Sequence, residues 1–288
     1  MQTQLEQAIE AISQVVLGKK HQIKLALTCL LAKGHLLIED LPGMGKTSLS
    51  QAIASTIGLE FNRVQFTSDL LPADIIGIST LGKNNKTEII KGPIFANFII
   101  ADEINRAPAK VQSALLESMQ ERQVTIGEQS FPVPAPFLVM ATQNPVEQEG
   151  TYPLPEAQLD RFMLKVVIDY PDQAEEIEIV NRFTSEGNNQ KIQPVLTPDK
   201  LIECCEIVNS IYVDEKLIKY ATDLVFATRY PEKYELSGIK SLIDFGASPR
   251  ASIYLIQAAK AYAFLKGRGY VIPQDVKSIG YDVMRHRV

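Results

Sequence analysis

Short apolar runs alternate with amphipathic segments over the first 170 residues of the chain. The runs predict buried strands, because a strand covered on both faces has no polar side to alternate with its apolar one. The segments between them repeat apolar residues every three or four positions, which is the period of a helix. The predicted strands are His35–Glu39, Phe61–Phe66, Asn97–Ala101, Pro136–Ala141 and Leu164–Ile168. The predicted helices are 2–16, Thr47–Ile57 and Pro108–Gln120, and Gln123–Val133 is expected to form a hairpin. This alternation predicts an α/β fold with a parallel sheet covered on both faces.

The pattern changes after Tyr170-Pro171. The stretch Ser185–Gln193 is polar and contains Gly187-Asn188-Asn189, which is a loop signal. From Thr197 onward the apolar spacing is helical. We therefore predict an α/β domain at 1–172, a linker at 173–196 and an all-α domain at 197–288. Its predicted helices cover 201–211, 217–225, Pro249–Lys266 and Pro273–Met284, with a long connection at Tyr230–Phe245.

The composition is that of an ordinary globular protein, with 45% hydrophobic and 22% charged residues among 288. The net charge of −5 gives no overall attraction to nucleic acid, so a nucleic-acid partner is not expected. Three cysteines, two of them adjacent, and three separated histidines match neither a disulfide framework nor a metal-ligand spacing. We expect buried, reduced thiols and a cytoplasmic location. There is no signal-peptide pattern and no apolar run of membrane-spanning length. Four cationic residues are expected on solvated faces: Lys19, Lys20, Arg285 and Arg287.

Residues 40–47 read Asp-Leu-Pro-Gly-Met-Gly-Lys-Thr and follow a predicted strand. A phosphate-binding loop requires Gly, four residues and then Gly-Lys-Ser/Thr. Gly45, Lys46 and Thr47 fit this pattern, but Asp40 stands in place of the first glycine. In such a loop the lysine reaches the β- and γ-phosphates and the threonine hydroxyl binds Mg²⁺. Because the first position is the farthest from the phosphates, we expect Asp40 to weaken nucleotide binding or leave it unchanged.

Polar residues also follow two other predicted strands, and ligands of parallel sheets bind beyond the carboxyl ends of the strands. Asp102 could bind Mg²⁺, Glu103 could take a proton from water, and the Asn144 amide could orient that water. By itself the acidic pair could equally complement a helix dipole. By itself Asn144, which precedes a proline, is more simply part of a turn. The phosphate loop upstream favours the catalytic interpretation of the acidic pair.

Two arginines occupy positions where a nucleotide could meet them. Arg161 comes just before the last predicted strand, at the domain edge, where a neighbouring subunit could present its nucleotide. A surface ion pair with Asp160 explains Arg161 equally well. Arg250 begins a helix of the second domain, where the dipole disfavours a cation. A γ-phosphate across the interdomain cleft would explain Arg250, although a solvated arginine is the more common case.

These motifs, in this order, resemble those of the AAA+ ATPases and specifically of the MoxR family. The resemblance covers the chain from Val16 to Arg285. It implies a P-loop AAA+ αβα sandwich with a five-stranded parallel sheet, followed by a small all-α lid. The segments that carry it are Gly92-Pro93-Ile94-Phe95, Asp102–Pro108, Ala141–Pro145 and Pro153–Phe162.

The resemblance implies a role for each matched residue. Lys46, Glu103, Asn144, Arg161 and Arg250 would be catalytic, with Arg161 acting in trans, and Thr47 and Asp102 would bind the metal. Two further segments, Pro72–Lys91 and Gln123–Val133, would be inserts. The residues that would bind ATP are Pro42, Gly43, Met44, Gly45, Lys46, Thr47 and Ser48, with Val16, Leu17 and Gly18 lining the adenine pocket.

At the level of the whole protein, the resemblance implies Mg²⁺-dependent ATP hydrolysis by a homo-oligomeric ring, expected to be a hexamer. The implied work is chaperone-like: maturation, metal insertion or remodelling of a client, with a partner that carries a von Willebrand factor A domain. Family sequences usually continue with helical residues after the position of Arg285, so a lid without its last helix is expected. The alternatives are a nucleic-acid or transcription-related AAA+ motor and a non-catalytic, nucleotide-gated scaffold.

Overall fold

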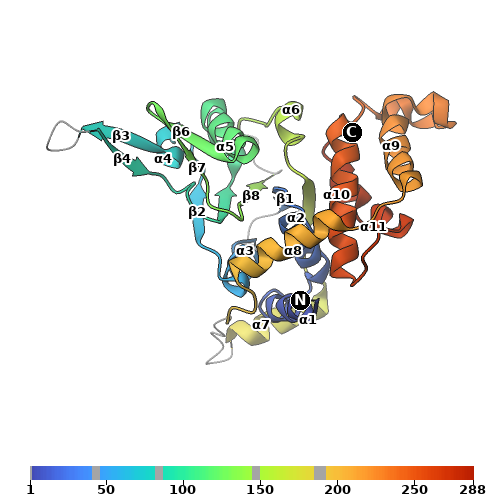
Figure 1. The fold of residues 1–288 in the computed structure, drawn as a ribbon, viewed down its shortest axis with the longest axis horizontal. Helices are drawn as coiled ribbons and strands as arrows, with labels where there is room; N and C mark the ends of the chain where they lie inside the picture. Colours follow the sequence, from blue (N-terminus) through green and yellow to red (C-terminus); the bar gives the residue numbers. More distant parts are fainter. Residues whose placement is uncertain (1, 41–45, 82–86, 145–149, 185–192) are drawn as a thin grey trace.

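The computed structural model of the protein describes residues 2–40, 46–81, 87–144, 150–184 and 193–288. A five-stranded sheet in the order β2-β5-β8-β1-β9 lies at its centre, and every pairing in it is parallel (Figure 1). The predicted parallel sheet is confirmed, and each predicted strand boundary lies within two residues of the observed one. The strands are β1 (Leu36–Asp40), β2 (Phe61–Gln65), β5 (Phe98–Asp102), β8 (Leu138–Gln143) and β9 (Leu164–Ile168).

Alternate residues of each strand point to opposite faces of the sheet and so divide the core into two clusters. In β1, Leu36 and Ile38 belong to one cluster and Leu37 to the other. The first cluster is completed by α1 (Gln2–Val15), α2 (Lys20–Leu31) and α3 (Lys46–Ile57). The second is completed by α4 (Pro72–Ile76) and α5 (Ala109–Glu121). Because both faces are covered, most of the strands appear in the sequence as apolar runs, whereas β2, at the edge of the sheet, carries Asn62, Arg63 and Gln65.

Two antiparallel hairpins project on the side of the sheet that is far from the C-terminal helices (Figure 1). One is formed by β3 (Gly77–Leu81) and β4 (Thr87–Lys91) and lies inside the predicted insert at Pro72–Lys91. The other is formed by β6 (Gln123–Ile126) and β7 (Gln129–Pro132), as predicted, and Gly127 in its turn has φ 63°. Two short helices follow strands of the central sheet: η1 (Ile104–Arg106) and α6 (Glu156–Leu159).

The C-terminal region is helical, as predicted, and we call it the lid. Its helices are α8 (Pro198–Ser210), α9 (Glu215–Arg229), α10 (Pro249–Leu265) and α11 (Pro273–Met284). The predicted connection at Tyr230–Phe245 contains two 3₁₀ helices, η2 (Pro231–Tyr234) and η3 (Ser237–Leu242). Within the described ranges, no helix combines the length and hydrophobicity needed to cross a bilayer.

Two of the longer helices were not predicted from the sequence. One is α2, which is apolar almost all round because it packs between the sheet and the lid helix α10. The other is α7 (Gln173–Thr184), which occupies the first half of the predicted linker. It begins with a capping box: Asp172 Oδ1 accepts from the Glu175 N–H at 2.8 Å, and Glu175 Oε2 accepts from the Asp172 N–H at 3.1 Å.

The prediction that Lys19 and Arg287 lie on solvated faces is wrong. Lys19 is 8% exposed and Arg287 is 2% exposed. Burial of these side chains is possible because backbone carbonyl groups receive their charged ends. The Lys19 Nζ donates to the Asp169 oxygen at 2.8 Å, and the Arg287 guanidinium donates to several carbonyls described below. The predicted buried thiols are confirmed at Cys29, Cys204 and Cys205.

His35 joins three elements through its imidazole ring. Nδ1 accepts from the Val139 N–H at 3.0 Å, so Nε2 carries the proton and donates to the Met119 oxygen at 3.0 Å. Burial, followed by the charge of Arg122, lowers the pKa of His35 to about 3. His286 of the lid is buried too, and burial followed by the charge of Arg287 lowers its pKa to about 3. Both rings are therefore neutral in the folded protein at physiological pH.

We expect the free energy of unfolding to fall as the pH drops below 6.5. Below that value the unfolded chain protonates both histidines, while the folded chain keeps them neutral down to about pH 3. The expected slope is about 1.4 kcal/mol per pH unit for each ring, which urea unfolding between pH 7 and pH 5 would measure. His35→Asn keeps an acceptor for Val139 and should halve the slope. An unchanged slope in this variant would show that His35 is not one of the responsible groups.

Candidate active site

Asp102, the last residue of β5, lies at the carboxyl end of the sheet and is 2% exposed. Its Oδ1 accepts from the Thr142 hydroxyl at 2.8 Å, and its Oδ2 lies 2.5 Å from Nη2 of Arg63. Arg63 comes from the neighbouring strand β2 and is about half exposed. A buried carboxylate at this sheet edge is thus held by a hydroxyl and faces a cation.

Glu103 follows Asp102 directly in a left-handed backbone conformation, with φ 56°. This conformation is uncommon for a residue with a side chain and concentrates at functional sites. The Glu103 N–H donates to the Thr142 hydroxyl at 2.9 Å, and Oε2 lies 3.2 Å from Nε2 of Gln65 and 3.0 Å from Arg106. Because Thr142 contacts both acidic residues, it fixes their position relative to the end of β8.

Asn144 follows β8 directly and is 6% exposed. Since β8 lies between β5 and β1, Asn144 lies between the acidic pair and the end of β1. The sheet therefore brings Asp102, Glu103 and Asn144 to one edge, as the sequence predicted.

The predicted phosphate loop begins at the same edge. β1 ends at Asp40, and α3 begins at Lys46, so the strand-then-helix context that the motif requires is present. Thr47 and Ser48 lie in the first turn of α3. The remaining predicted loop residues, Pro42, Gly43, Met44 and Gly45, lie outside the described residues, as do the side chains of Asp40 and Lys46.

The predicted adenine-pocket segment Val16–Gly18 also lies at this edge. Lys19, which follows it, bonds to the oxygen of Asp169, and Asp169 follows β9. The last residue of β9, Ile168, is paired with Asp40 of β1. Gly18 has φ 69°, and a side chain there would collide with the carboxylate of Glu175. Helix α7 therefore packs closely against this segment.

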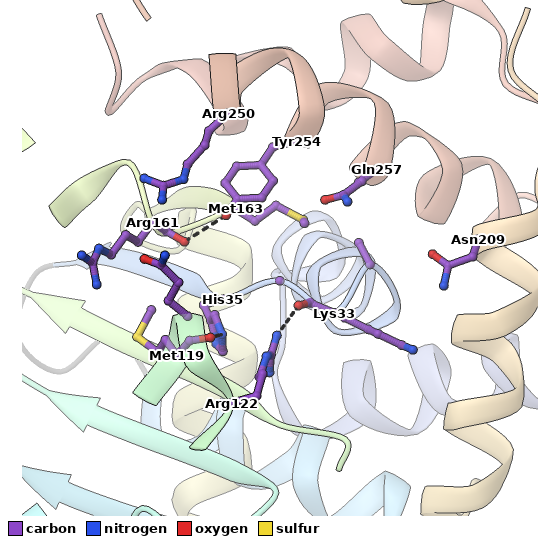
Figure 2. Close-up of a pocket in the computed structure, with 13 residues that line it drawn as sticks. Lys33, His35, Met119, Arg122, Arg161, Met163, Asn209, Arg250, Tyr254 and Gln257 are labelled. Atoms are coloured by element: carbon purple, nitrogen blue, oxygen red, sulfur yellow. Dashed lines mark hydrogen bonds between the residues drawn. The ribbon is translucent and has the colours of Figure 1, made fainter. Parts of the chain in front are cut away.

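The predicted arginines lie elsewhere, in a pocket of about 290 Å³ near the amino ends of β1 and β9. Four cationic side chains line it: Lys33, Arg122, Arg161 and Arg250. No aspartate or glutamate is found among the described residues that line it. In Figure 2, Arg161 and Arg250 extend toward the same side of the pocket, from the N-terminal domain and from α10 respectively.

The guanidinium groups of both arginines make few hydrogen bonds within the protein. Arg161 Nη1 donates to the Leu116 oxygen at 3.1 Å, and its Nε is buried with no hydrogen-bond partner among the described residues. Arg250 Nη1 lies 3.4 Å from Asp160 Oδ2, a long and partly exposed contact. Both guanidinium groups therefore keep donors for an additional anion.

The position of Arg250 does not fit the expected contact with its own chain's γ-phosphate. Its pocket is lined by Lys33 and His35, which precede β1, whereas the phosphate loop follows β1. A strand of five residues spans about 16 Å, more than an arginine side chain can cross. Arg250 thus lies on the side of Arg161, away from the nucleotide loop of its own subunit.

Sequence reasoning missed four residues that hold the acidic pair: Arg63, Gln65, Arg106 and Thr142. The sequence shows two of them, Arg63 and Gln65, as polar residues within a predicted strand, but the pairing of that strand with β5 comes from the structure alone. Gln65 is in register with Asp102. Polar residues in a strand can therefore belong to a site when the neighbouring strand ends in acidic residues.

Arg63→Met is expected to lower the free energy of unfolding of the nucleotide-free protein by about 1–3 kcal/mol, because Asp102 loses a charged donor while it stays buried. Adding Mg²⁺ and ADP should stabilise the variant more than the wild type, since the metal then supplies the missing positive charge. Urea unfolding with and without Mg²⁺·ADP measures both effects. Arg63→Lys, which keeps the charge, is the control; equal stabilisation of all three proteins by Mg²⁺·ADP would contradict the prediction.

Comparisons with known proteins agree with this geometry. Residues 35–164 match the family model "ATPase family associated with various cellular activities (AAA)", and residues 237–288 match the AAA lid domain. The chain is 48% identical to Chaperone MoxR1 of Mycobacterium tuberculosis over 287 residues, covering 99% of this chain and 75% of the relative. The chain belongs to the MoxR family of AAA+ ATPases. It is also 32% identical to Protein MoxR of Paracoccus denitrificans, covering 96% of this chain and 86% of that protein.

A solved structure from Cytophaga hutchinsonii supports the MoxR assignment at the level of the fold. It is 47% identical, superposes with a TM-score of 0.93, and the match covers 99% of this chain and 87% of the other. The predicted family, the α/β sandwich with a helical lid and the ATPase class are therefore confirmed.

Proposed function

We propose that this MoxR-family protein hydrolyses ATP with Mg²⁺ at the interfaces of a homo-oligomeric ring, with six subunits as the expected number. The observation that supports this most strongly is the placement of the predicted residues at two opposite ends of the sheet. Asp102, Glu103 and Asn144 lie at the carboxyl ends of the strands, and Arg161 and Arg250 lie at the amino ends. One chain cannot bring the two groups together. Head-to-tail packing of identical subunits can, because it places one end of each copy against the other end of its neighbour.

The carboxyl end has the chemistry needed to bind a magnesium nucleotide. Mg²⁺ prefers hard oxygen ligands, and the Thr47 hydroxyl and the Asp102 carboxylate supply them. The contact between Asp102 and Arg63 shows that this carboxylate accommodates a cation beside it. When bound, Mg²⁺ neutralises charge on the β- and γ-phosphate oxygens. Lys46 binds the same phosphates, and residues 43–48 supply backbone N–H groups to them, while Val16–Gly18 contacts the adenine.

The remaining steps belong to side chains around the γ-phosphate. Glu103 accepts a proton from the attacking water, and Asn144 orients that water. Arg161 and Arg250 of the neighbouring subunit stabilise the charge that develops on the transferred phosphoryl group. Oligomerisation is therefore required for turnover.

The purpose of the hydrolysis is chaperone-like work on a client protein. One relative is named Chaperone MoxR1, and other relatives are named MoxR. Maturation or metal insertion of the client, a partner with a von Willebrand factor A domain and a cytoplasmic location complete the proposal on the basis of the family resemblance. The net charge of −5 argues against a nucleic-acid motor.

The proposal is tested by measuring the ATPase rate per subunit against protein concentration, with the assembly state followed by light scattering. We expect the rate to rise with the assembled fraction and to be lost in Glu103→Gln. A rate that stays constant while the protein goes from monomer to assembly contradicts shared sites. Absence of turnover in assembled wild-type protein would favour the scaffold, and stimulation by DNA would favour the motor.

A further inference from the structure

The lid holds the backbone on both sides of Arg161. Four consecutive carbonyl oxygens, those of residues 160–163, accept hydrogen bonds from lid side chains. Arg287 donates to the oxygens of Asp160, Phe162 and Met163. The Tyr254 hydroxyl donates to the oxygen of Arg161, the contact drawn in Figure 2.

Arg287 is the centre of this arrangement. Its side chain is 1% exposed, and its Nε donates to the Asp160 carboxylate at 2.8 Å. The guanidinium also stacks over the ring of Tyr254, with 5.2 Å between its carbon and the ring centre. His286 adds a bond from its Nε2 to the Phe162 oxygen at 3.0 Å. A buried arginine whose donors reach one short segment fixes that segment rigidly, because displacing it would leave buried donors without acceptors.

The carboxylate of Asp160 links this arrangement to Arg250. Its Oδ2 accepts from the Ser248 hydroxyl at 2.8 Å and from Arg250 Nη1 at 3.4 Å. Ser248 caps α10 and accepts from the N–H of Arg250 at 3.1 Å, so the helix end and Asp160 are joined. Arg250 makes the longest of these contacts and is 41% exposed. Asp160 would keep its bonds to Arg287 and Ser248 if Arg250 turned to a different anion.

The N-terminal domain holds the N–H groups of the Arg161 segment and buries the Phe162 side chain in the second core cluster. It contributes the turn bonds that follow α6, one bond from the Met163 N–H to the His35 oxygen, and one from the Arg161 side chain to the Leu116 oxygen. The carbonyl groups of the segment, in contrast, face the lid. A movement of the lid therefore has to carry the Arg161 backbone with it or break several buried bonds.

We propose that Arg287 is a positioning residue that makes the lid place Arg161 and Arg250 as one unit against the nucleotide of the neighbouring subunit. This inference rests on the proposed function, in which both arginines act in trans. Arg287 thus affects an active site that its own side chain does not contact. A movement of the lid then positions Arg161 and Arg250 together against the nucleotide of the neighbouring subunit.

The test uses Arg287→Met, Arg287→Lys and Arg268→Met in the full chain. Arg268 is the matched control, because it is a lid arginine bonded to Asp275 within the lid and not to residues 160–163. At equal assembly, we expect Arg287→Met to lower kcat at least about tenfold and to leave the Kd for ATP within about twofold, since the nucleotide loop lies at the other end of β1. Arg287→Lys, which keeps the charge but not the fork of donors, should recover part of kcat. Arg268→Met should have the kcat of the wild type at equal assembly.

Subunit mixing shows which half of the site is damaged. Arg287→Met subunits retain Glu103, and Glu103→Gln subunits retain both arginines and Arg287. Mixed rings should therefore regain about one quarter of wild-type turnover, the fraction of interfaces that combine the two intact halves. No recovery, or an equal loss in Arg268→Met, would overturn the inference. If Arg287→Met does not assemble, Tyr254→Phe, which removes the donor to the Arg161 oxygen, should still lower kcat and be restored by mixing.

The same mixing separates this inference from the proposed function. If Glu103→Gln and Arg161→Ala subunits restore each other while Glu103→Gln and Arg287→Met subunits do not, the inference about Arg287 fails alone. If Glu103→Gln and Arg161→Ala subunits do not restore each other, the shared site itself is wrong.

Discussion

Replacing Glu103 with glutamine is expected to lower kcat for ATP hydrolysis by about 10²–10⁴-fold, the usual contribution of a general base. ATP binding should change little, because the glutamine is isosteric and the phosphate loop is untouched. The amide oxygen can still accept from Gln65 and Arg106, which lie 3.2 and 3.0 Å from Oε2 of Glu103. Steady-state ATPase assays and equilibrium binding of a fluorescent ATP analogue measure the two quantities separately.

The matched control for this variant is Glu60→Gln. Glu60 is exposed and directly precedes β2, at the end of that strand opposite to Gln65 and the acidic pair. The Glu60→Gln variant loses a glutamate carboxylate as Glu103→Gln does, and its kcat should stay within about twofold of the wild-type value. A Glu103→Gln variant that retained more than a tenth of wild-type turnover would mean that another group accepts the proton.

The sequence predicts the central part of the molecule well because its signals are local and strong. Apolar runs predict four of the five strands, and polar residues at the carboxyl ends of parallel strands meet at one edge of the sheet. Asp102 and Glu103 were favoured in this way, Asn144 was given a role only through the family resemblance, and the order of motifs identified the family. Their partners were harder to find: Arg63 and Gln65 contact the acidic pair through a pairing between β2 and β5 that no local pattern encodes.

The lid shows where sequence reasoning fails and why. Arg287 was expected in solvent because an arginine near the end of a chain usually lies there, yet its environment is formed by residues about 125 positions away. Arg250 was expected to face a γ-phosphate across the interdomain cleft, and nothing in the sequence indicates which end of the sheet the lid covers. Helix α7, in contrast, could have been predicted, since Asp172 and Glu175 have the spacing of a capping box.

Arg161→Ala is expected to lower kcat by about 10³-fold or more, the lower range for an arginine that acts on a transferred phosphoryl group. The Kd for ATP should stay within a few fold, because Arg161 lies at the amino end of β9 and the nucleotide loop follows the carboxyl end of β1. Stability should change little: Arg161 is partly exposed, and its side chain loses one bond, to the Leu116 oxygen. Arg161→Lys keeps the charge without the planar fork and should remain well below wild-type turnover.

Mixing experiments decide whether Arg161 acts within its own subunit or on the next one. An Arg161→Ala subunit contributes an intact loop and Glu103, while a Glu103→Gln subunit contributes intact arginines. Two inactive proteins should therefore produce active interfaces when they assemble together, and turnover should rise with the fraction of mixed contacts. If Arg161 acted on its own subunit's nucleotide, every subunit in the mixture would stay inactive, whatever the ratio. The opposite-end placement of Glu103 and Arg161 in one chain leads us to expect the first result.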